Sequence, residues 1–146
     1  MANRLEGKVA IVTGAGQGIG AAIAELYAVE GCKVLITGRT QSKLDDIAGK
    51  ITAAGGTCET LVALAGEMDQ SEATVGKAIT DWGRVDILVN NAHTFTDYLP
   101  IEDPKMEANC KIDFQSAFFG SLQLMQLCFP HMQKQGGGSI LSLIHI

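Results

Sequence analysis

The sequence predicts an α/β fold, a doubly wound parallel sheet of about five strands with helices on both faces. Short apolar segments rich in β-branched residues alternate with segments of helical periodicity, which is typical of right-handed βαβ units. A cluster of glycines follows the first apolar segment and opens the first helical one. The length of 146 residues suits one domain, and no repeat or low-complexity segment divides it. We therefore expect a single domain over residues 1–146.

The first part of the chain is expected to form three strands, each followed by a helix. Val9–Val12 is a short apolar segment that ends at glycines, as a buried parallel strand does. The helix after it is expected to stop at Gly31, because glycine is favoured just past a helix end. Two more strands are expected at 34–37 and 60–65. Helical spacing joins Leu44, Ile47, Ile51 and Ala54 in the second helix, and Val75, Ile79 and Trp82 in the third.

The rest of the chain is expected to add two strands and one long helix. The fourth strand is expected at 85–89, and a loop with two prolines follows it. A helical pattern then runs from about residue 105 to residue 135, where three glycines break it. The fifth strand is expected at 139–144.

Composition excludes several classes of partner. The chain carries 16 acidic and 11 basic side chains, a net charge of −5, without a Lys/Arg cluster. That balance argues against nucleic acid or an anionic membrane as a partner. No apolar run reaches the roughly 18 residues of a membrane span. The four cysteines are widely spaced and lack zinc-ligand spacing, so we expect free thiols, no bound metal and a cytoplasmic location.

The glycine cluster has the spacing of a phosphate-binding turn. Gly14, Gly18 and Gly20 form a G-x-x-x-G-x-G pattern between the first strand and the first helix. Gly14 lets the strand turn sharply, Gly18 lets a pyrophosphate approach the backbone, and Gly20 lets the helix pack closely. The unpaired N–H groups and the dipole of the helix then hold the phosphate charge.

A second motif, Asn90-Asn91-Ala92, ends the fourth expected strand about 75 residues later. With the glycine loop, it resembles the short-chain dehydrogenase/reductase family over the full length of the chain. The resemblance implies a Rossmann-like NAD(P)-binding domain over residues 1–146. It also implies an NAD(P)(H)-dependent oxidoreductase that transfers hydride between carbonyl and alcohol groups. The cofactor-binding residues predicted are Gly14, Ala15, Gln17, Gly18, Ile19, Gly20, Arg39, Asn91 and Ala92.

His93 departs from the family pattern, which has a glycine after Asn-Asn-Ala. It puts a side chain where the family's backbone passes close to the nucleotide. We interpret it as a loop histidine without a catalytic role. Weakened cofactor binding is the alternative that stays open.

The second strand predicts NADP(H) in preference to NAD(H). NAD-binding folds usually place an acidic residue about 20 positions beyond the glycines, on the ribose 2′-OH. Gly38 stands there, and Arg39 follows it with a guanidinium suited to a 2′-phosphate. Gln17 weakens this case, because many NADP-binding relatives carry a basic residue just before the second glycine. Glu67 and Asp69 are both candidates for the acid that faces the adenine.

The family's catalytic pair, Tyr-x-x-x-Lys, is not found in residues 1–146. In relatives the lysine lowers the pKa of the tyrosine, which exchanges a proton with the substrate oxygen. Four residues after Tyr27 stands Gly31, and four after Tyr98 stands Glu102. No catalytic residue is therefore predicted.

Two supporting positions of the family are also unmatched. Counting back from Pro130 places Ala117 where the family's long helix carries asparagine. Counting from Gly138 places His145 where the family carries its catalytic serine. Histidine can exchange protons, but without the tyrosine and lysine we interpret His145 as incidental.

These observations predict the cofactor-binding part of a family member, ending before the Tyr/Lys helix. We expect a dinucleotide partner, a small carbonyl or alcohol substrate only if the chain is completed, and no activity of the chain alone. A non-catalytic nucleotide-binding or association module and a non-functional truncation product are the alternatives.

Stopping at Ile146 is expected to leave apolar surface bare. The fifth strand would form an apolar sheet edge, and such edges pair with other chains. Marginal stability and self-association are therefore expected, through this edge and one side of the long helix. The helix residues concerned are Phe114, Phe118, Phe119, Leu122, Met125 and Phe129.

Overall fold

Five parallel strands form one sheet in the order β3-β2-β1-β4-β5. The computed structural model describes residues 3–143. The chain starts in the middle of the sheet, builds outward to β3, then returns to the other side of β1. This reversal confirms the doubly wound fold predicted from the sequence. The strands are β1 (Val9–Val12), β2 (Lys33–Gly38), β3 (Thr57–Val62), β4 (Ile87–Asn90) and β5 (Ser139–Ser142).

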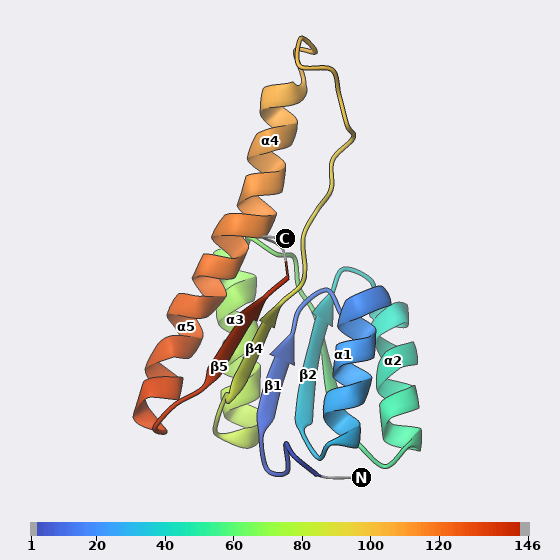
Figure 1. Cartoon of the computed structure of the whole chain (residues 1–146), viewed down its shortest axis with the longest axis vertical. Helices are drawn as coiled ribbons and strands as arrows, with labels where there is room; N and C mark the ends of the chain where they lie inside the picture. Colours follow the sequence, from blue (N-terminus) through green and yellow to red (C-terminus); the bar gives the residue numbers. More distant parts are fainter. Residues whose placement is uncertain (1–2, 144–146) are drawn as a thin grey trace.

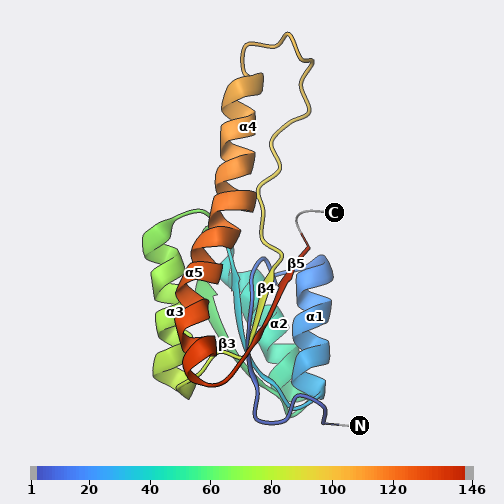
Figure 2. The same cartoon turned by 60° about the vertical axis from the view of Figure 1, so that its left-hand side comes forward.

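The helices cover the two faces of this sheet (Figures 1 and 2). One face carries α1 (Gly18–Val29) and α2 (Gln41–Ala53). The other carries α3 (Met68–Trp82) and α5 (Gly120–Lys134). The π-helix η1 (Gln115–Phe119) joins α5 to α4 (Met106–Phe114), and α4 projects beyond the sheet beside the loop that follows β4 (Figure 1).

Side chains of β1 point alternately to the two faces of the sheet, so the hydrophobic core has two parts. Ala10 and Val12 pack with α1 and α2, whereas Val9 and Ile11 pack with α3 and α5. All four side chains are buried. Successive residues of a strand point to opposite faces, and both faces of a doubly wound sheet are covered. The uninterrupted apolar segment is thus explained by burial on both sides.

Apart from β1, the strands begin or end at other residues than expected, and β2 covers Lys33–Gly38 and not 34–37. β3 covers Thr57–Val62 and not 60–65, because its pairing with β2 begins at Thr57 opposite Lys33. β3 is an edge strand with alternating exposure, so polar residues belong to it and an apolar run does not mark it. β4 starts at Ile87, two residues later than expected. β5 ends at Ser142 and does not include Leu143, whereas the expected fifth strand extends to Ile144, which lies outside the described residues.

The long helix is confirmed, with one local change of hydrogen bonding at η1. A Cβ atom on Gly120 would lie 2.7 Å from the backbone nitrogen of Gly66, so the helix passes against the turn after β3. Gln115 donates a hydrogen bond to the carbonyl of Gly66 at 2.7 Å from the same side. Single π-turns inside α-helices often occur at functional sites. η1 itself lies beside the turn after β3, at the end of the sheet.

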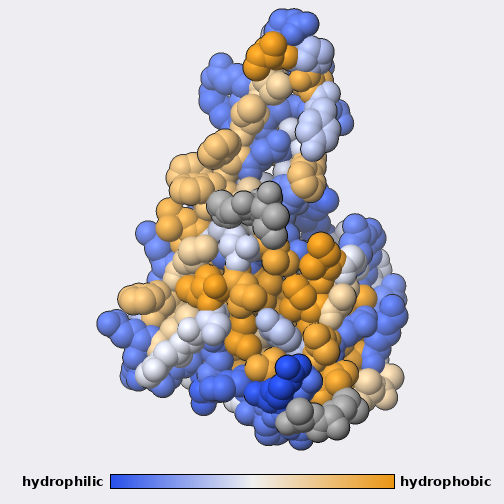
Figure 3. Space-filling model, viewed as in Figure 1, coloured by the Kyte–Doolittle hydropathy of each residue, from blue (hydrophilic) through white to orange (hydrophobic). Residues whose placement is uncertain are grey.

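Apolar side chains are exposed on the long helix and on β5. Phe114, Phe118, Phe119, Leu122 and Phe129 are exposed as predicted, and Met125 is half-buried. Ile140 and Leu141 of β5 are each 40% exposed. Figure 3 shows apolar side chains gathered over the β5, β4 and β1 side of the molecule. Across residues 3–143, no helix combines the length and apolarity needed for a membrane crossing.

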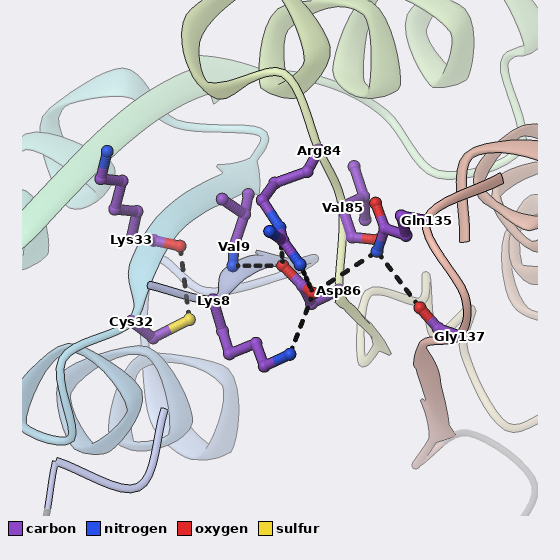
Figure 4. A network of polar contacts seen from close by, with 9 residues as sticks. All are labelled: Lys8, Val9, Cys32, Lys33, Arg84, Val85, Asp86, Gln135 and Gly137. Carbon is purple, nitrogen blue, oxygen red and sulfur yellow. Dashed lines mark hydrogen bonds and ion pairs between the residues drawn. The ribbon is translucent and has the colours of Figure 1, made fainter. Parts of the chain in front are cut away.

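A buried carboxylate, that of Asp86, joins β1 and β4 at the end of the sheet where these strands begin (Figure 4). Asp86 accepts a hydrogen bond from the backbone N–H of Val9 at 3.0 Å and two from the guanidinium of Arg84 at 2.6 and 2.7 Å. Lys8 lies 3.4 Å from the same carboxylate. Burial alone would raise the pKa of Asp86, but the bonds from Arg84 and Val9 and the nearby positive charges lower it below its usual value.

Candidate functional site

A cavity of about 620 Å³ lies at the carboxyl ends of the strands. The turns after β1, β2, β3 and β4 contribute its walls, and α4 and η1 close one side. Doubly wound sheets bind their ligands in this crevice, where the strand order reverses. The volume is in the range of small-molecule and cofactor sites.

The glycine loop after β1 borders this cavity. Gly14 has φ +64°, and a Cβ there would lie 2.8 Å from the Cα of Ala92. Gly18 has φ +60°, and a Cβ there would meet nothing within 4 Å. At Gly20 a Cβ would lie 2.6 Å from the Asn91 side-chain nitrogen and 2.7 Å from the Gly14 carbonyl. Gly14 and Gly20 are therefore required by close packing, whereas Gly18 leaves open space at the start of α1.

Thr13 and Asn91 lock the glycine loop to β4. The side chain of Asn91 donates to the carbonyls of Thr13 at 3.0 Å and Gly14 at 3.2 Å. The hydroxyl of Thr13 accepts from the backbone N–H groups of Asn91 at 3.1 Å and Ala92 at 2.9 Å, and it donates to Val89. Thr13, which directly precedes Gly14, is a positioning residue that sequence reasoning did not assign to the site. Its buried hydroxyl fixes the distance between the two motifs.

The other loop residues differ in their surroundings. The N–H of Ala15 donates to the carbonyl of Thr37 at 2.9 Å, and its side chain is buried. Gln17 is exposed and lines the cavity. Ile19 is 67% exposed. By helix geometry the first N–H groups of α1 have no partner within the helix, so they are available to an anion.

One end of the cavity is cationic. Gly38, the last residue of β2, and Arg39, which follows it, line this end, and the Arg39 side chain is exposed. Lys43, from the first turn of α2, lines the same end and donates to the side-chain oxygen of Gln17 at 2.6 Å. Sequence reasoning missed Lys43, because nothing in the chain order shows that α2 meets the glycine loop. Of the two acids considered for the adenine contact, Glu67 lines the cavity.

The other end of the cavity lies between the loop after β4 and η1. His93 lines it, half-buried, with its ring in edge contact with Phe95. Ser116 accepts a hydrogen bond from the backbone N–H of Thr94 at 3.0 Å, which fixes this loop to η1. The half-buried Ala117, at the family's asparagine position, follows Ser116 in η1. His145 lies outside the described residues.

The two buried cysteines, Cys32 and Cys128, have unreactive thiols. Burial raises the pKa of Cys32 and of Cys128 to about 12, so both thiols stay protonated at neutral pH. Within residues 3–143 no three His, Cys, Asp or Glu side chains gather as a metal site would require.

Comparisons with known proteins agree with this geometry. The sequence model of a family described as short chain dehydrogenase matches residues 8–144. The chain is 32% identical over 142 residues to 3-oxoacyl-[acyl-carrier-protein] reductase of Thermotoga maritima, covering 96% of this chain and 56% of that protein. It is 32% identical over 148 residues to 7alpha-hydroxysteroid dehydrogenase of Bacteroides fragilis, with coverage of 99% and 56%. The chain thus spans about half the length of these relatives.

Two solved structures with bound cofactors share the fold. A 7α-hydroxysteroid dehydrogenase complexed with NADH and 7-oxo glycochenodeoxycholic acid matches with a TM-score of 0.90 and 34% identity, over 97% of this chain and 54% of that one. A metagenomic short-chain oxidoreductase in complex with NADP matches with a TM-score of 0.85 and 33% identity, over 94% and 62%. Both dinucleotides thus occur among the similar structures.

Proposed function

Because the chain belongs to the short-chain dehydrogenase/reductase family, we propose that its cavity binds a nicotinamide dinucleotide, NADP(H) in preference to NAD(H). The whole protein would then be an oxidoreductase that interconverts carbonyl and alcohol groups. The observation that carries the proposal is the glycine loop, which leaves open space at Gly18 beside the free N–H groups that start α1. We propose that the protein is located in the cytoplasm, because its four cysteines are widely spaced and are expected to be free thiols, as in a reducing compartment.

The residues around the cavity fit a dinucleotide. Its pyrophosphate would lie at the start of α1, where the helix dipole and free N–H groups favour negative charge. The first turn of α1 holds no acidic residue that would repel it. Gly18 would keep a side chain out of its path, and Asn91 and Ala92 would lie along its nicotinamide half.

When bound, the dinucleotide supplies the hydride donor or acceptor. The residues of this chain bind and orient it, and the Thr13–Asn91 hydrogen bonds hold the loop that it contacts. No proton-transferring residue is assigned to this chain, since it contains no Tyr-x-x-x-Lys sequence.

The preference for NADP(H) is supported by Arg39. The acid that would hydrogen-bond the ribose 2′-OH in NAD-binding folds is replaced by Gly38, and the exposed guanidinium of Arg39 lines the cavity beside it. Arg39→Ala is expected to weaken NADPH binding by about 1–3 kcal/mol, because a hydrogen bond to a charged group is lost, and to change NADH binding little. Equilibrium titration with each dinucleotide measures this, and tighter binding of NADH than of NADPH by the unaltered chain would contradict the preference.

A nucleotide-binding or association module without hydride transfer is the second candidate. The lack of a Tyr-x-x-x-Lys sequence in residues 1–146 favours it for this polypeptide taken alone. Reading the coding sequence beyond codon 146 for that sequence separates the two candidates. Its presence would favour the oxidoreductase.

We also propose that the chain self-associates through the long helix and β5. Phe129 is 57% exposed on α5, and Leu141 is 40% exposed on the sheet edge. The unaltered chain is expected to sediment as an oligomer, and Phe129→Glu or Leu141→Glu is expected to shift it toward the monomer, because a charge opposes burial of the contact. Tyr98→Glu is the matched control, since Tyr98 is 96% exposed on the loop after β4. A monodisperse, cooperatively melting monomer of the unaltered chain would refute this proposal.

A further inference from the structure

We propose that Lys43 supplies a second cation for the 2′-phosphate of NADP(H), and that Gln17 orients its ammonium group. This inference rests on the proposed function of the cavity. The starting observation is the hydrogen bond from the Nζ atom of Lys43 to the Oε1 atom of Gln17, 2.6 Å long, between α2 and the glycine loop. Both residues line the cavity at the end where Arg39 lies.

The backbone fixes Lys43 near the loop. Leu44, its neighbour in α2, is fully buried and anchors the first turn of the helix in the core. On the loop side, a Cβ atom at Gly16 would lie 3.2 Å from the Cβ of Lys43, so glycine at that position allows the close approach. The side chain of Lys43 therefore starts directly beside the glycine loop, and its hydrogen bond to Gln17 limits where its ammonium group points.

The charge of Lys43 opposes the dipole of its own helix. Cations are unfavourable at a helix N-terminus, where the dipole is positive. In the described structure no side chain caps the N-terminus of α2, and its first turn holds no acidic residue. The nearest carboxylate along the helix, Asp45, accepts a hydrogen bond from Gln41 at 2.6 Å. Arg39, Lys43 and the free end of α2 thus concentrate positive potential at one end of the cavity in a chain of net charge −5.

An anion with several acceptor oxygens is the ligand that this arrangement fits. In NADP(H) the 2′-phosphate is the group that distinguishes it from NAD(H), and it belongs at the end of the second strand of a dinucleotide-binding fold. Neutral Gln17 argues against NADP(H) when read from the sequence alone. The structure reverses that argument, because the side chain of Gln17 accepts a hydrogen bond from Lys43 of α2 and so has a cation beside it.

The test compares NADPH and NADH binding to three variants of the 146-residue chain. Lys43→Ala is expected to weaken NADPH binding about 10-fold, in keeping with the loss of a charge-assisted hydrogen bond, and NADH binding less than about 2-fold. Lys43→Arg is expected to restore the preference in part. Lys50→Ala is the matched control, because Lys50 is an exposed lysine in the last turn of the same helix.

Gln17→Leu tests the positioning role. It keeps both cations and is expected to weaken NADPH binding about 3-fold without a change for NADH, since only the orientation of the ammonium group is lost. The ratio of the affinity for NADPH to the affinity for NADH should fall with rising salt in the unaltered chain. It should fall less steeply in Lys43→Ala.

The outcomes separate this inference from the proposed function. If NADPH binds and Lys43→Ala leaves it unchanged, or weakens both dinucleotides equally, the role of Lys43 is overturned while the cofactor site stands. If the unaltered chain binds neither dinucleotide, the proposed function fails, and the role of Lys43 fails with it.

Discussion

Replacing Gly20 by alanine is expected to destabilise the chain by about 1–3 kcal/mol and to weaken dinucleotide binding at least about 10-fold. The added Cβ atom would lie 2.6 Å from the Asn91 side-chain nitrogen and 2.7 Å from the Gly14 carbonyl, which is closer than such atoms can approach. The Asn91 side chain and the loop would have to separate, and the hydrogen bonds that join the two motifs would weaken. Thermal unfolding and NADPH titration measure the two effects.

Gly49→Ala is the matched control for Gly20→Ala. Gly49 is also helical, but a Cβ there would meet nothing within 4 Å. Alanine is the better helix former, so this variant should gain about 0.5–1 kcal/mol in stability and bind NADPH unchanged. Equal stability of Gly20→Ala and the unaltered chain would show that the loop and Asn91 are not tightly packed.

Replacing Asp86 by alanine is expected to cost about 2–4 kcal/mol of unfolding free energy. The side chain of Asp86 is 6% exposed, and its loss leaves the N–H of Val9 without its carboxylate and Arg84 without its partner. The usual cost of breaking a buried pair is about 3–5 kcal/mol, and it is reduced here because Arg84 is 42% exposed. Chemical denaturation measures the change. Asp81→Asn should cost under about 1 kcal/mol, since that acid pairs with Lys77 at the surface.

The same carboxylate predicts how stability depends on pH. The folded state lowers the pKa of Asp86, so its contribution is fully present above the ordinary aspartate pKa and is lost as the pH falls through the lowered value. The unaltered chain should therefore lose more stability on acidification than Asp86→Asn, which keeps an acceptor but has no charge to titrate. Parallel pH profiles of the two would contradict this account.

The sequence predicted best what short-range patterns encode. The apolar segment Val9–Val12 and the glycines after it are confirmed as β1 and the turn into α1, because burial on both faces demands an apolar strand. Gly31 follows the end of α1 as expected, with φ +88°, a left-handed conformation that favours glycine. The parallel, doubly wound sheet followed from the alternation of elements and the handedness of βαβ units.

What the sequence could not predict depends on contacts between distant elements. The start of β3 is set by pairing with β2, so its polar residues gave no local signal. The role of Thr13 arises from hydrogen bonds to residues 76 to 79 positions away. Lys43 reads as an ordinary helix lysine until α2 is packed beside the glycine loop, where its hydrogen bond to Gln17 becomes visible.

The central claim is that the cavity beside the glycine loop binds a nicotinamide dinucleotide and prefers NADP(H). The most direct measurement is calorimetric titration of the unaltered 146-residue chain with NADPH and, separately, with NADH. We expect saturable binding of both at one site, tighter for NADPH by about 10-fold or more, as one charged hydrogen bond to the 2′-phosphate would give. Binding of neither dinucleotide would contradict the claim, and tighter binding of NADH would contradict its preference for NADP(H).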